Sequence, residues 1–278
     1  AGRALLRGRG VFYSDSLDEA MGVVEGYRDY AALAPVVPAA RPEGLAVAET
    51  GHLSGAQDED ATKALLAAYG VPVNCGAVAA TPEAAEALAA GFTAPFVVKV
   101  VSPDIVHKSD VGGVVLDLET PADVAGAVRQ MAARLVQALP EARIEGYLVQ
   151  EMRAAPLEMF IGARNDPQFG PMVMVGAGGV LIELMKDVAI ARAPVSPEQA
   201  RAMIGRLAVA PLLEGWRGSG PLDAGALAEA VARVSWMVAD LGDRFGELDA
   251  NPVLVGRRGE GCVAVDARLL MIDDAKGE

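Results

Sequence analysis

Apolar and polar residues alternate along this chain with two periods, one typical of helices and one typical of strands. Apolar residues recur every three or four positions, behind a capping residue or a proline, in the stretches that we predict to be helices: residues 15–34, 58–69, 81–91, 120–139, 226–241 and a helix that begins at Ser196. Runs of β-branched and other apolar residues predict strands at residues 10–13, 71–78, 96–101, 114–118, 144–152, 157–163, 172–175, 180–184, 247–255 and 262–268. Elements of both kinds are therefore predicted, and we expect an α+β protein with helices on one face of its sheets.

The order of these elements predicts how the chain is divided. Residues 1–35 hold one strand and one helix, which cannot bury a core alone, and residues 36–56 are rich in Pro, Gly and Ala without periodicity, as in a linker. Residues 57–143 read as a small open-faced α+β lobe. The strand at 144–152 is expected to open a second lobe, residues 144–278, in which a hairpin turns around glycines 176–179.

One strand of the first lobe carries a lysine, Lys99, inside its apolar run, and a polar loop with His107 follows it. An ammonium is rarely buried without a partner, so we expect an anion to meet Lys99. A histidine with an ordinary pKa near ~6.5 can act as a base, a nucleophile or a phosphoryl carrier at neutral pH. The alternative is a solvent-facing loop histidine beside a lysine that snorkels outward.

A second polar cluster is predicted in the hairpin of residues 247–268. Alternation places Glu247, Asp249 and Asn251 on one strand face, and a symmetric turn centred between Arg258 and Gly259 sets Asn251 directly across from Asp266. Carboxylate and amide oxygens brought together in this way suit Mg²⁺. The alternative is a polar strand face in water.

Composition narrows the possible functions. The formal net charge of −13 argues against a nucleic-acid binder, so any anionic ligand must be held by a few local cations, for which Arg192 and Arg217 are candidates. No apolar run approaches the ~18 residues of a membrane span, and no secretory signal begins the chain, so we expect a cytoplasmic protein. Cys75 and Cys262 have no metal-type spacing and are expected to be reduced and buried.

Three motifs of this chain resemble one family. The string V-x-K-x-x-S-P-D-x-x-H-K-S-D-x-G-G-V around Lys99 and His107, the string E-L-D-A-N-P around Asn251, and W-R-G at Arg217 resemble the ATP-grasp domain of NDP-forming acyl-CoA synthetases, relatives of succinyl-CoA synthetase. The resemblance covers about residues 56–278 and implies a two-lobed ATP-grasp fold. Residues 10–35 more loosely resemble the end of the CoA-ligase domain that precedes it in fused synthetases.

The resemblance also implies roles for individual residues. Lys99 would contact the nucleotide phosphates, His107 would relay a phosphoryl group, and Arg217 would balance phosphate charge, as Arg192 could by its charge alone. The remaining implied residues are those of the adenine hinge (Glu151, Met152), of the nucleotide site (Glu158, Gly178, Gly179) and of the magnesium site (Asn251, Asp266), to which strand alternation adds Asp249. Single strand glutamates are often only solvated, and the glycines, which fit neither a P-loop nor a dinucleotide fingerprint, also suit a plain hairpin turn.

The activity implied by the resemblance joins a carboxylic acid to CoA while ATP is cleaved to ADP and phosphate, or runs in reverse. The modules that bind CoA and carry the first phosphohistidine would be partners, fused or separate, and this chain alone would be incomplete. Two alternatives stay open: another ATP-grasp carboxylate ligase, which needs no relay histidine, and a non-catalytic nucleotide-sensing module. No nucleic-acid or membrane partner is expected.

Overall fold

The structure, a computed structural model, divides into two compact units between Pro38 and Ala39. It describes residues 8–9, 16–32, 39–42, 44–45, 47–105, 108–179, 187–216 and 218–272. In the first unit, helix α2 (Leu17–Ala32) lies within the predicted span of residues 15–34 and leaves its apolar stripe exposed at Leu17, Met21 and Val24. The strand predicted at residues 10–13 lies outside the described residues.

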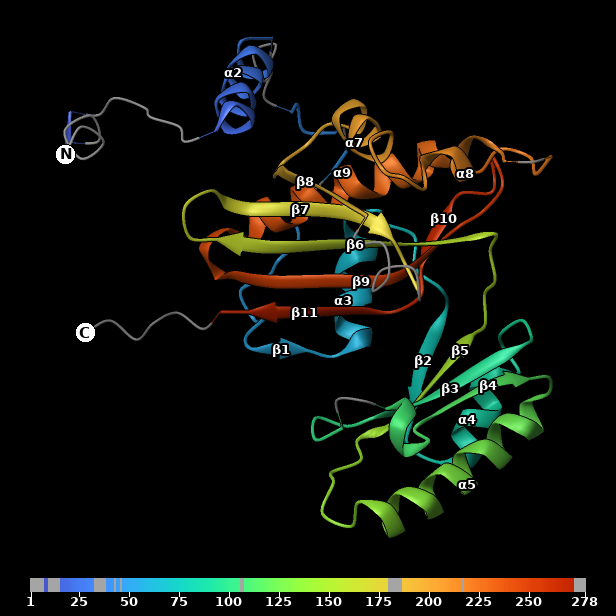
Figure 1. Cartoon of the computed structure of the whole chain (residues 1–278). Helices are drawn as coiled ribbons and strands as arrows, with labels where there is room; N and C mark the ends of the chain where they lie inside the picture. The colour runs from blue at the N-terminus through green and yellow to red at the C-terminus, as the bar shows by residue number, and fades with distance from the viewer. Residues whose placement is uncertain are drawn as a thin grey trace. The chain divides into compact units, whose positions relative to one another are not determined.

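The second unit contains two antiparallel sheets (Figure 1). The larger, seven-stranded sheet has the order β1 (Ala56–Gln57), β11 (Ala267–Met271), β9 (Phe245–Val255), β6 (Leu157–Asp166), β7 (Gly170–Ala177) and β8 (Val188–Arg192), with β10 (Cys262–Ala264) paired to β9. The smaller, four-stranded sheet has the order β2 (Gly76–Ala79), β5 (Gly146–Glu151), β3 (Phe96–Val101) and β4 (Val114–Leu118).

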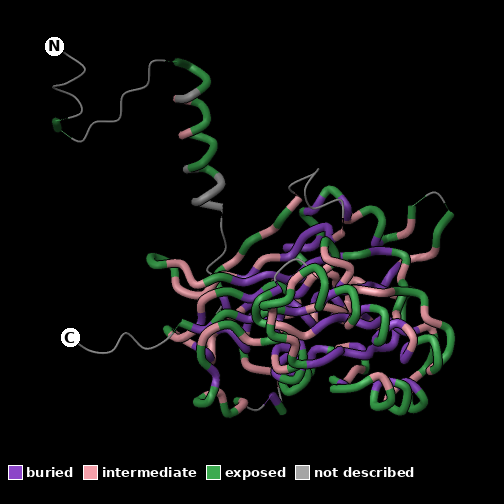
Figure 2. The backbone as a smooth tube through the Cα atoms, turned by 90° about the horizontal axis from the view of Figure 1, so that it is seen from below, coloured by how far each residue is buried: buried purple, intermediate pink, exposed green. Residues whose placement is uncertain are grey.

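Helices cover one face of each sheet. The larger sheet packs against α3 (Glu59–Ala68), α7 (Pro197–Ile204) and α9 (Ala224–Leu241), with the short α8 (Ala210–Glu214) nearby, and the smaller sheet packs against α4 (Pro82–Ala89) and α5 (Pro121–Ala138). The side chains of Asp58, Thr81, Thr120 and Ser196 cap four of these helices, as polar residues before an apolar period predict. Buried residues concentrate in the interior of this unit, and exposed residues lie at its edges (Figure 2).

The predicted boundary between the lobes was wrong. The strand expected to open the second lobe is β5, which pairs with β2 and β3 in the smaller sheet. In the other direction, α3 packs into the core of the larger sheet through Leu65 and Leu66. An apolar strand shows no preference for one sheet in its own residues, because its partners are set by pairing with distant segments.

The expected linker is partly packed. From Ala39 onward it belongs to the larger unit, and the side chains of Leu45 and Leu53 lie in its core. Arg41 donates two hydrogen bonds to the Asp240 carboxylate, at 2.9 and 2.7 Å, and its guanidinium lies over the ring of Trp236 at 5.1 Å. These contacts fix the segment against α9.

The same carboxylate gives a testable pH dependence. Tyr69 is fully buried and donates a 2.8 Å hydrogen bond to Asp240; burial and this bond raise the pKa of Tyr69 to about 12. A raised pKa means that the stability contributed by the protonated phenol is complete below the unfolded pKa of about 10 and is lost as pH rises toward 12. Urea unfolding of wild type and Tyr69→Phe should therefore diverge, with wild type losing about 1 kcal/mol relative to the variant by about pH 11. Parallel curves would contradict this.

Each sheet has a second face that no helix of the described residues covers, and these faces carry the polar residues. On the smaller sheet, Phe96 and Val98 pack toward the helices, whereas Lys99 points the other way, in register with Leu148. On the larger sheet, Leu248 packs in the core and the adjacent Asp249 faces away. Strand alternation therefore places both predicted clusters on open faces.

The described residues contain no helix that is long and apolar enough to cross a membrane. Both cysteines are free, but the expectation that both are buried was wrong for Cys75, which is exposed beside β2. Cys262 is buried as predicted, and burial raises the pKa of its thiol to about 12.

Candidate functional site

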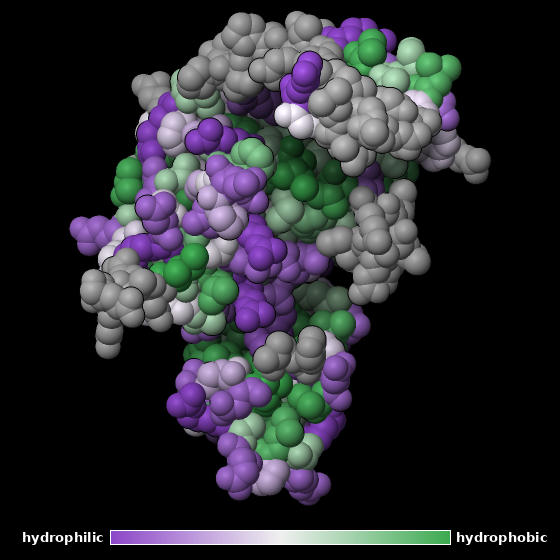
Figure 3. Space-filling view, turned by 60° about the vertical axis from the view of Figure 1, so that its left-hand side comes forward, coloured by the Kyte–Doolittle hydropathy of each residue, from purple (hydrophilic) through white to green (hydrophobic). Residues whose placement is uncertain are grey.

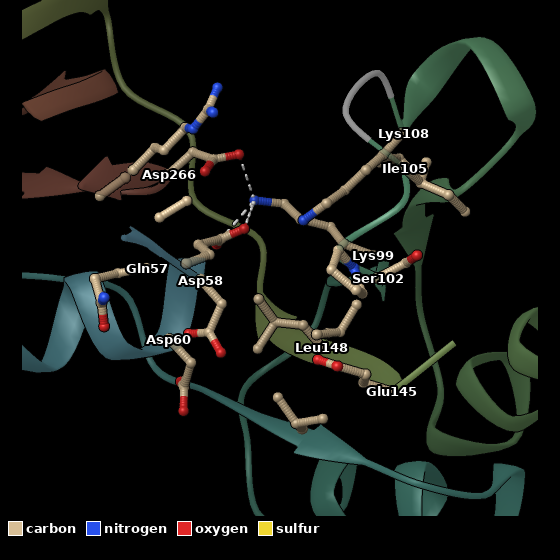
Figure 4. Close-up of a pocket in the computed structure, with 18 of the residues that line it drawn as sticks. Gln57, Asp58, Asp60, Lys99, Ser102, Ile105, Lys108, Glu145, Leu148 and Asp266 are labelled. Carbon is tan, nitrogen blue, oxygen red and sulfur yellow. Dashed lines mark hydrogen bonds and ion pairs between the residues drawn. The ribbon is translucent and has the colours of Figure 1, made fainter. Parts of the chain in front are cut away.

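The principal cleft of the described residues has a volume of about 710 Å³ and is lined by both sheets and by the start of α3 (Figure 4). Its lining includes the side chains of Lys99, Lys108, Asp266 and Arg268. Hydrophilic residues gather between the two sheets of this unit, with apolar residues on either side (Figure 3). The cleft therefore brings cations and carboxylates together at the two open faces.

Lys99 lies at the centre of this cleft. Only 7% of the surface of Lys99 is exposed. Its Nζ lies 3.0 and 3.1 Å from the two carboxylate oxygens of Glu59 and 3.0 Å from Oδ2 of Asp266. The expectation that an anion meets this lysine is confirmed; the anions are two carboxylates of the chain itself. Lys99 lies on β3 of the smaller sheet, and Asp266 follows β10 of the larger sheet. The Lys99 ammonium therefore connects the two sheets (Figure 4).

A buried polar network continues from Glu59. Gln150 donates a 2.7 Å hydrogen bond to Glu59, and Lys63 lies 3.7 Å from the same oxygen and donates to Asn74. Asn74 in turn donates to the backbone oxygen of Glu151 at 3.1 Å. Burial lowers the pKa of Lys63, against the opposing attraction of Glu59. Sequence analysis missed this network, because a Glu and a Lys four residues apart on a helix are typical of a solvated pair.

The predicted hairpin register is confirmed. Cys262 pairs with Val255 and Ala267 with Ala250, and between these pairs the Asn251 backbone nitrogen donates to the Asp266 oxygen at 3.1 Å. Asp249 lies directly opposite Arg268, a residue that sequence analysis did not select although the same register locates it.

The hairpin residues fit a magnesium ion. Partial burial raises the pKa of Asp249, and repulsion from Asp266 and Glu247 raises it further, so negative charge is concentrated here. Two carboxylates and one amide suit Mg²⁺, which usually takes one or two carboxylates and leaves positions for phosphate oxygens and water. No group of three or more His, Cys, Asp or Glu side chains that could hold a metal ion occurs among the described residues.

The predicted hinge residues lie at the end of β5. The Glu151 carboxylate accepts a 2.9 Å hydrogen bond from the Thr93 backbone nitrogen and a 2.7 Å bond from Arg153; the backbone bond and the guanidinium lower its pKa. The backbone N–H of Met152 donates a 2.8 Å hydrogen bond to the backbone oxygen of Pro95. The carboxylate of Glu151 is thus already hydrogen-bonded within the chain, as are its backbone nitrogen, which donates to Cys75 at 3.1 Å, and its backbone oxygen, which accepts from Asn74.

Glu158 and the glycine pair lie together. Glu158, exposed on β6, accepts a 2.9 Å hydrogen bond from the Gly178 nitrogen through its backbone oxygen, and its carboxylate lies against Gly179. A Cβ at Gly178 would lie 2.6 Å from the Met159 oxygen, so this position requires glycine. Strand β7 pairs with β6 on one side and with β8 on the other. The strand predicted at residues 180–184 lies outside the described residues.

Three further positions complete the set. Arg192 ends β8 opposite Met172 and is exposed. His107 and Arg217 lie outside the described residues, so their predicted roles stay predictions. Lys108, directly after His107, lines the cleft and points into it (Figure 4). It is a second cation that sequence analysis named only as part of the loop.

Comparison with known proteins identifies the family. Residues 49–271 match the family model described as the ATP-grasp domain. The chain belongs to the ATP-grasp domain family. It is 38% identical over 209 residues to the beta subunit of acetate–CoA ligase [ADP-forming] II of Pyrococcus furiosus, covering 75% of this chain and 89% of that subunit.

Other relatives are longer enzymes of the same kind. This ATP-grasp chain is 37% identical over 211 residues to 4-hydroxybutyrate–CoA ligase [ADP-forming] of Nitrosopumilus maritimus, covering 76% of the chain but only 30% of that enzyme. Among solved structures, acetyl-coenzyme A synthetase 1 of Ca. Korarchaeum cryptofilum with coenzyme A and Ca-AMPCP has a TM-score of 0.73 at 38% identity, covering 78% of this chain and 93% of that one. Within the ATP-grasp family, the chain therefore corresponds to the beta-subunit part of ADP-forming acyl-CoA ligases, as its motifs predicted.

Proposed function

We propose that this chain is the nucleotide-binding part of an acid–thiol ligase that forms an acyl-CoA from a carboxylic acid, CoA and ATP, releasing ADP and phosphate. The observation that carries the proposal is the ion-paired Lys99 in the cleft, next to the carboxylate of Asp266. A cation that faces a predicted metal site across a cleft is the arrangement that a nucleotide polyphosphate with its Mg²⁺ requires.

The chain's own residues would share the work as follows. Lys99 and Lys108 would bind phosphate oxygens, and Asp249, Asn251 and Asp266 would hold Mg²⁺, which would neutralise part of the phosphate charge. The backbone at Glu151 and Met152 would orient the adenine. Glu158, Gly178 and Gly179 would border the nucleotide, and Arg192 and Arg217 would counter the charge of the transferred phosphate.

The group transfer would use His107. Its unprotonated imidazole nitrogen attacks the γ-phosphorus of ATP, the N–P bond forms, and the bond from that phosphorus to the bridging oxygen breaks, so that ADP leaves with both electrons. In the reverse direction, ADP takes the phosphoryl group from His107 and ATP is formed. A solved relative from Ca. Korarchaeum cryptofilum is described with Mg-AMPPCP and a phosphohistidine segment pointing towards the nucleotide binding site, which supports a histidine as the group that exchanges phosphoryl with the nucleotide.

The proposed partners are two modules that are not among the described residues of this chain. A CoA-binding module and a first phosphohistidine module would make the acyl phosphate and exchange its phosphoryl group with His107. We expect the chain to act in the cytoplasm, where ATP and CoA are supplied.

The relay is tested by labelling. The purified chain, incubated with Mg²⁺ and γ-labelled ATP, should acquire an acid-labile, base-stable phosphoryl group that mass spectrometry places on His107. His107→Asn should acquire none, whereas His52→Asn, which replaces the chain's other, exposed histidine, should label like wild type. A folded, nucleotide-binding wild type that remains unlabelled, or label that survives His107→Asn, would contradict the relay.

A further inference from the structure

Glu59 is a buried carboxylate to which the proposed function gives no part. It is the first residue of α3, directly after the capping residue Asp58, and only 7% of it is exposed. A buried carboxylate is costly unless several donors satisfy it, so its position calls for a reason.

Glu59 is held from three sides. Gln150 on β5 donates to Oε1 at 2.7 Å, Lys63 on the next turn of α3 lies 3.7 Å from the same oxygen, and Lys99 on β3 reaches both oxygens. These donors come from three different elements, two of them strands of the smaller sheet. The carboxylate is therefore fixed in place independently of any ligand.

The two acidic partners of Lys99 differ in how firmly they are held. The Asp266 side chain is 46% exposed, whereas that of Glu59 is 5% exposed, and Asp266 offers Lys99 a single oxygen at 3.0 Å. Asp266 also lies in the hairpin that suits a metal. Of the two contacts, the one to Asp266 is the one that a ligand can exchange.

We propose that Glu59 is a positioning residue that fixes the Lys99 ammonium at the phosphate end of the cleft. When nucleotide and metal bind, Asp266 releases the Lys99 ammonium and becomes a ligand of the metal. Lys99 stays bound to Glu59 and donates the N–H that Asp266 has released to a phosphate oxygen. This inference rests on the proposed nucleotide site.

The network extends the role of Glu59 toward the hinge. Lys63 lies between Glu59 and Asn74, and Asn74 donates to the backbone oxygen of Glu151 at 3.1 Å. The two predicted ends of the nucleotide site, the phosphate lysine and the adenine hinge, are thus joined through α3. Glu59 sets the position of one end relative to the other.

A double-mutant cycle tests this role. The variants are Glu59→Gln, Lys99→Met and the double variant, each measured twice, by urea unfolding and by calorimetric titration with ADP and Mg²⁺. Glu86→Gln is the matched control, because it makes the same Glu-to-Gln change at an exposed position of α4 that does not line the cleft.

The unfolding cycle reports the contact itself. Each single variant removes one partner of the buried Glu59–Lys99 pair, so the double variant should be destabilised by less than the sum of the two, by at least tenfold in the unfolding equilibrium constant. Additive effects would overturn the pairing, whether or not nucleotide binds.

The binding cycle reports the function. Glu59→Gln should weaken Mg-ADP binding about tenfold in the wild-type background and less than twofold in the Lys99→Met background, since its effect passes through Lys99. Glu86→Gln should change it less than twofold. An equal loss in both backgrounds, or no loss from Glu59→Gln alone, would overturn the positioning role. If wild type binds no nucleotide although the unfolding cycle shows coupling, the proposed nucleotide site is contradicted, and so is the positioning role. Only the contact between Glu59 and Lys99 is then supported.

Discussion

Replacing Lys99 with methionine is expected to weaken binding of Mg-ADP about a hundredfold. Methionine keeps much of the apolar stem, which packs in β3, but removes the ammonium at the centre of the cleft. A hydrogen bond to a charged phosphate contributes about 1.5–3 kcal/mol, and about 2.7 kcal/mol corresponds to a hundredfold change in affinity. Calorimetric titration of wild type and variant with ADP in the presence of Mg²⁺ measures this directly.

The control for Lys99→Met must remove a positive charge elsewhere. Arg129→Met does so on α5, where Arg129 forms an exposed ion pair with Glu83 at 3.2 Å. Its affinity for Mg-ADP should stay within twofold of wild type. Because Lys99→Met also leaves Glu59 without its main partner, its folding must be confirmed by circular dichroism and urea unfolding at the titration temperature. A folded Lys99→Met chain with wild-type affinity would contradict the phosphate role of Lys99.

Replacing Asp266 with asparagine should remove the dependence of ADP binding on magnesium. The carboxylate is one of two in the predicted metal site, and its loss leaves Asp249 as the remaining anionic ligand beside the Asn251 amide. We expect Mg²⁺ to strengthen ADP binding at least tenfold in wild type and less than twofold in Asp266→Asn. Titrations with ADP in Mg²⁺ and in EDTA give the ratio for each protein.

Asp266→Asn also weakens an ion pair with Lys99, so the two effects must be separated. The metal effect is the ratio of the ADP affinities with and without Mg²⁺. A change that alters both affinities by the same factor leaves this ratio unchanged. Asp60→Asn, which removes one negative charge at an exposed position lining the cleft, should keep the wild-type ratio. A wild-type ratio in Asp266→Asn would exclude Asp266 as a metal ligand.

The hairpin shows what the sequence alone could predict well. The centre of the turn between Arg258 and Gly259 determines the pairing of every residue in the two arms, so the position of Asn251 beside Asp266 follows from the turn and the strand period. Helix starts were predicted equally well, because Thr81, Thr120 and Ser196 cap their helices through contacts only three residues away. These features depend on local chemistry.

Features that depend on distant pairing were not predicted. Nothing in the residues of β5 indicates that it joins β2 and β3, and Glu59 reads as a solvated helix residue until the fold brings Lys99 to it across forty positions. Cys75 was misjudged for the same reason, since its exposure depends on where β2 lies in the sheet. The lysine was nevertheless informative, because a buried cation requires an anion wherever that anion lies in the sequence.

The central claim, that this chain binds a nucleotide polyphosphate with magnesium in the cleft between its sheets, is tested most directly by one measurement. Calorimetric titration of the purified chain with ADP, in Mg²⁺ and in EDTA, should show one binding site per chain, at least tenfold tighter with Mg²⁺. A folded chain that binds neither ADP nor ATP in either condition would contradict the account.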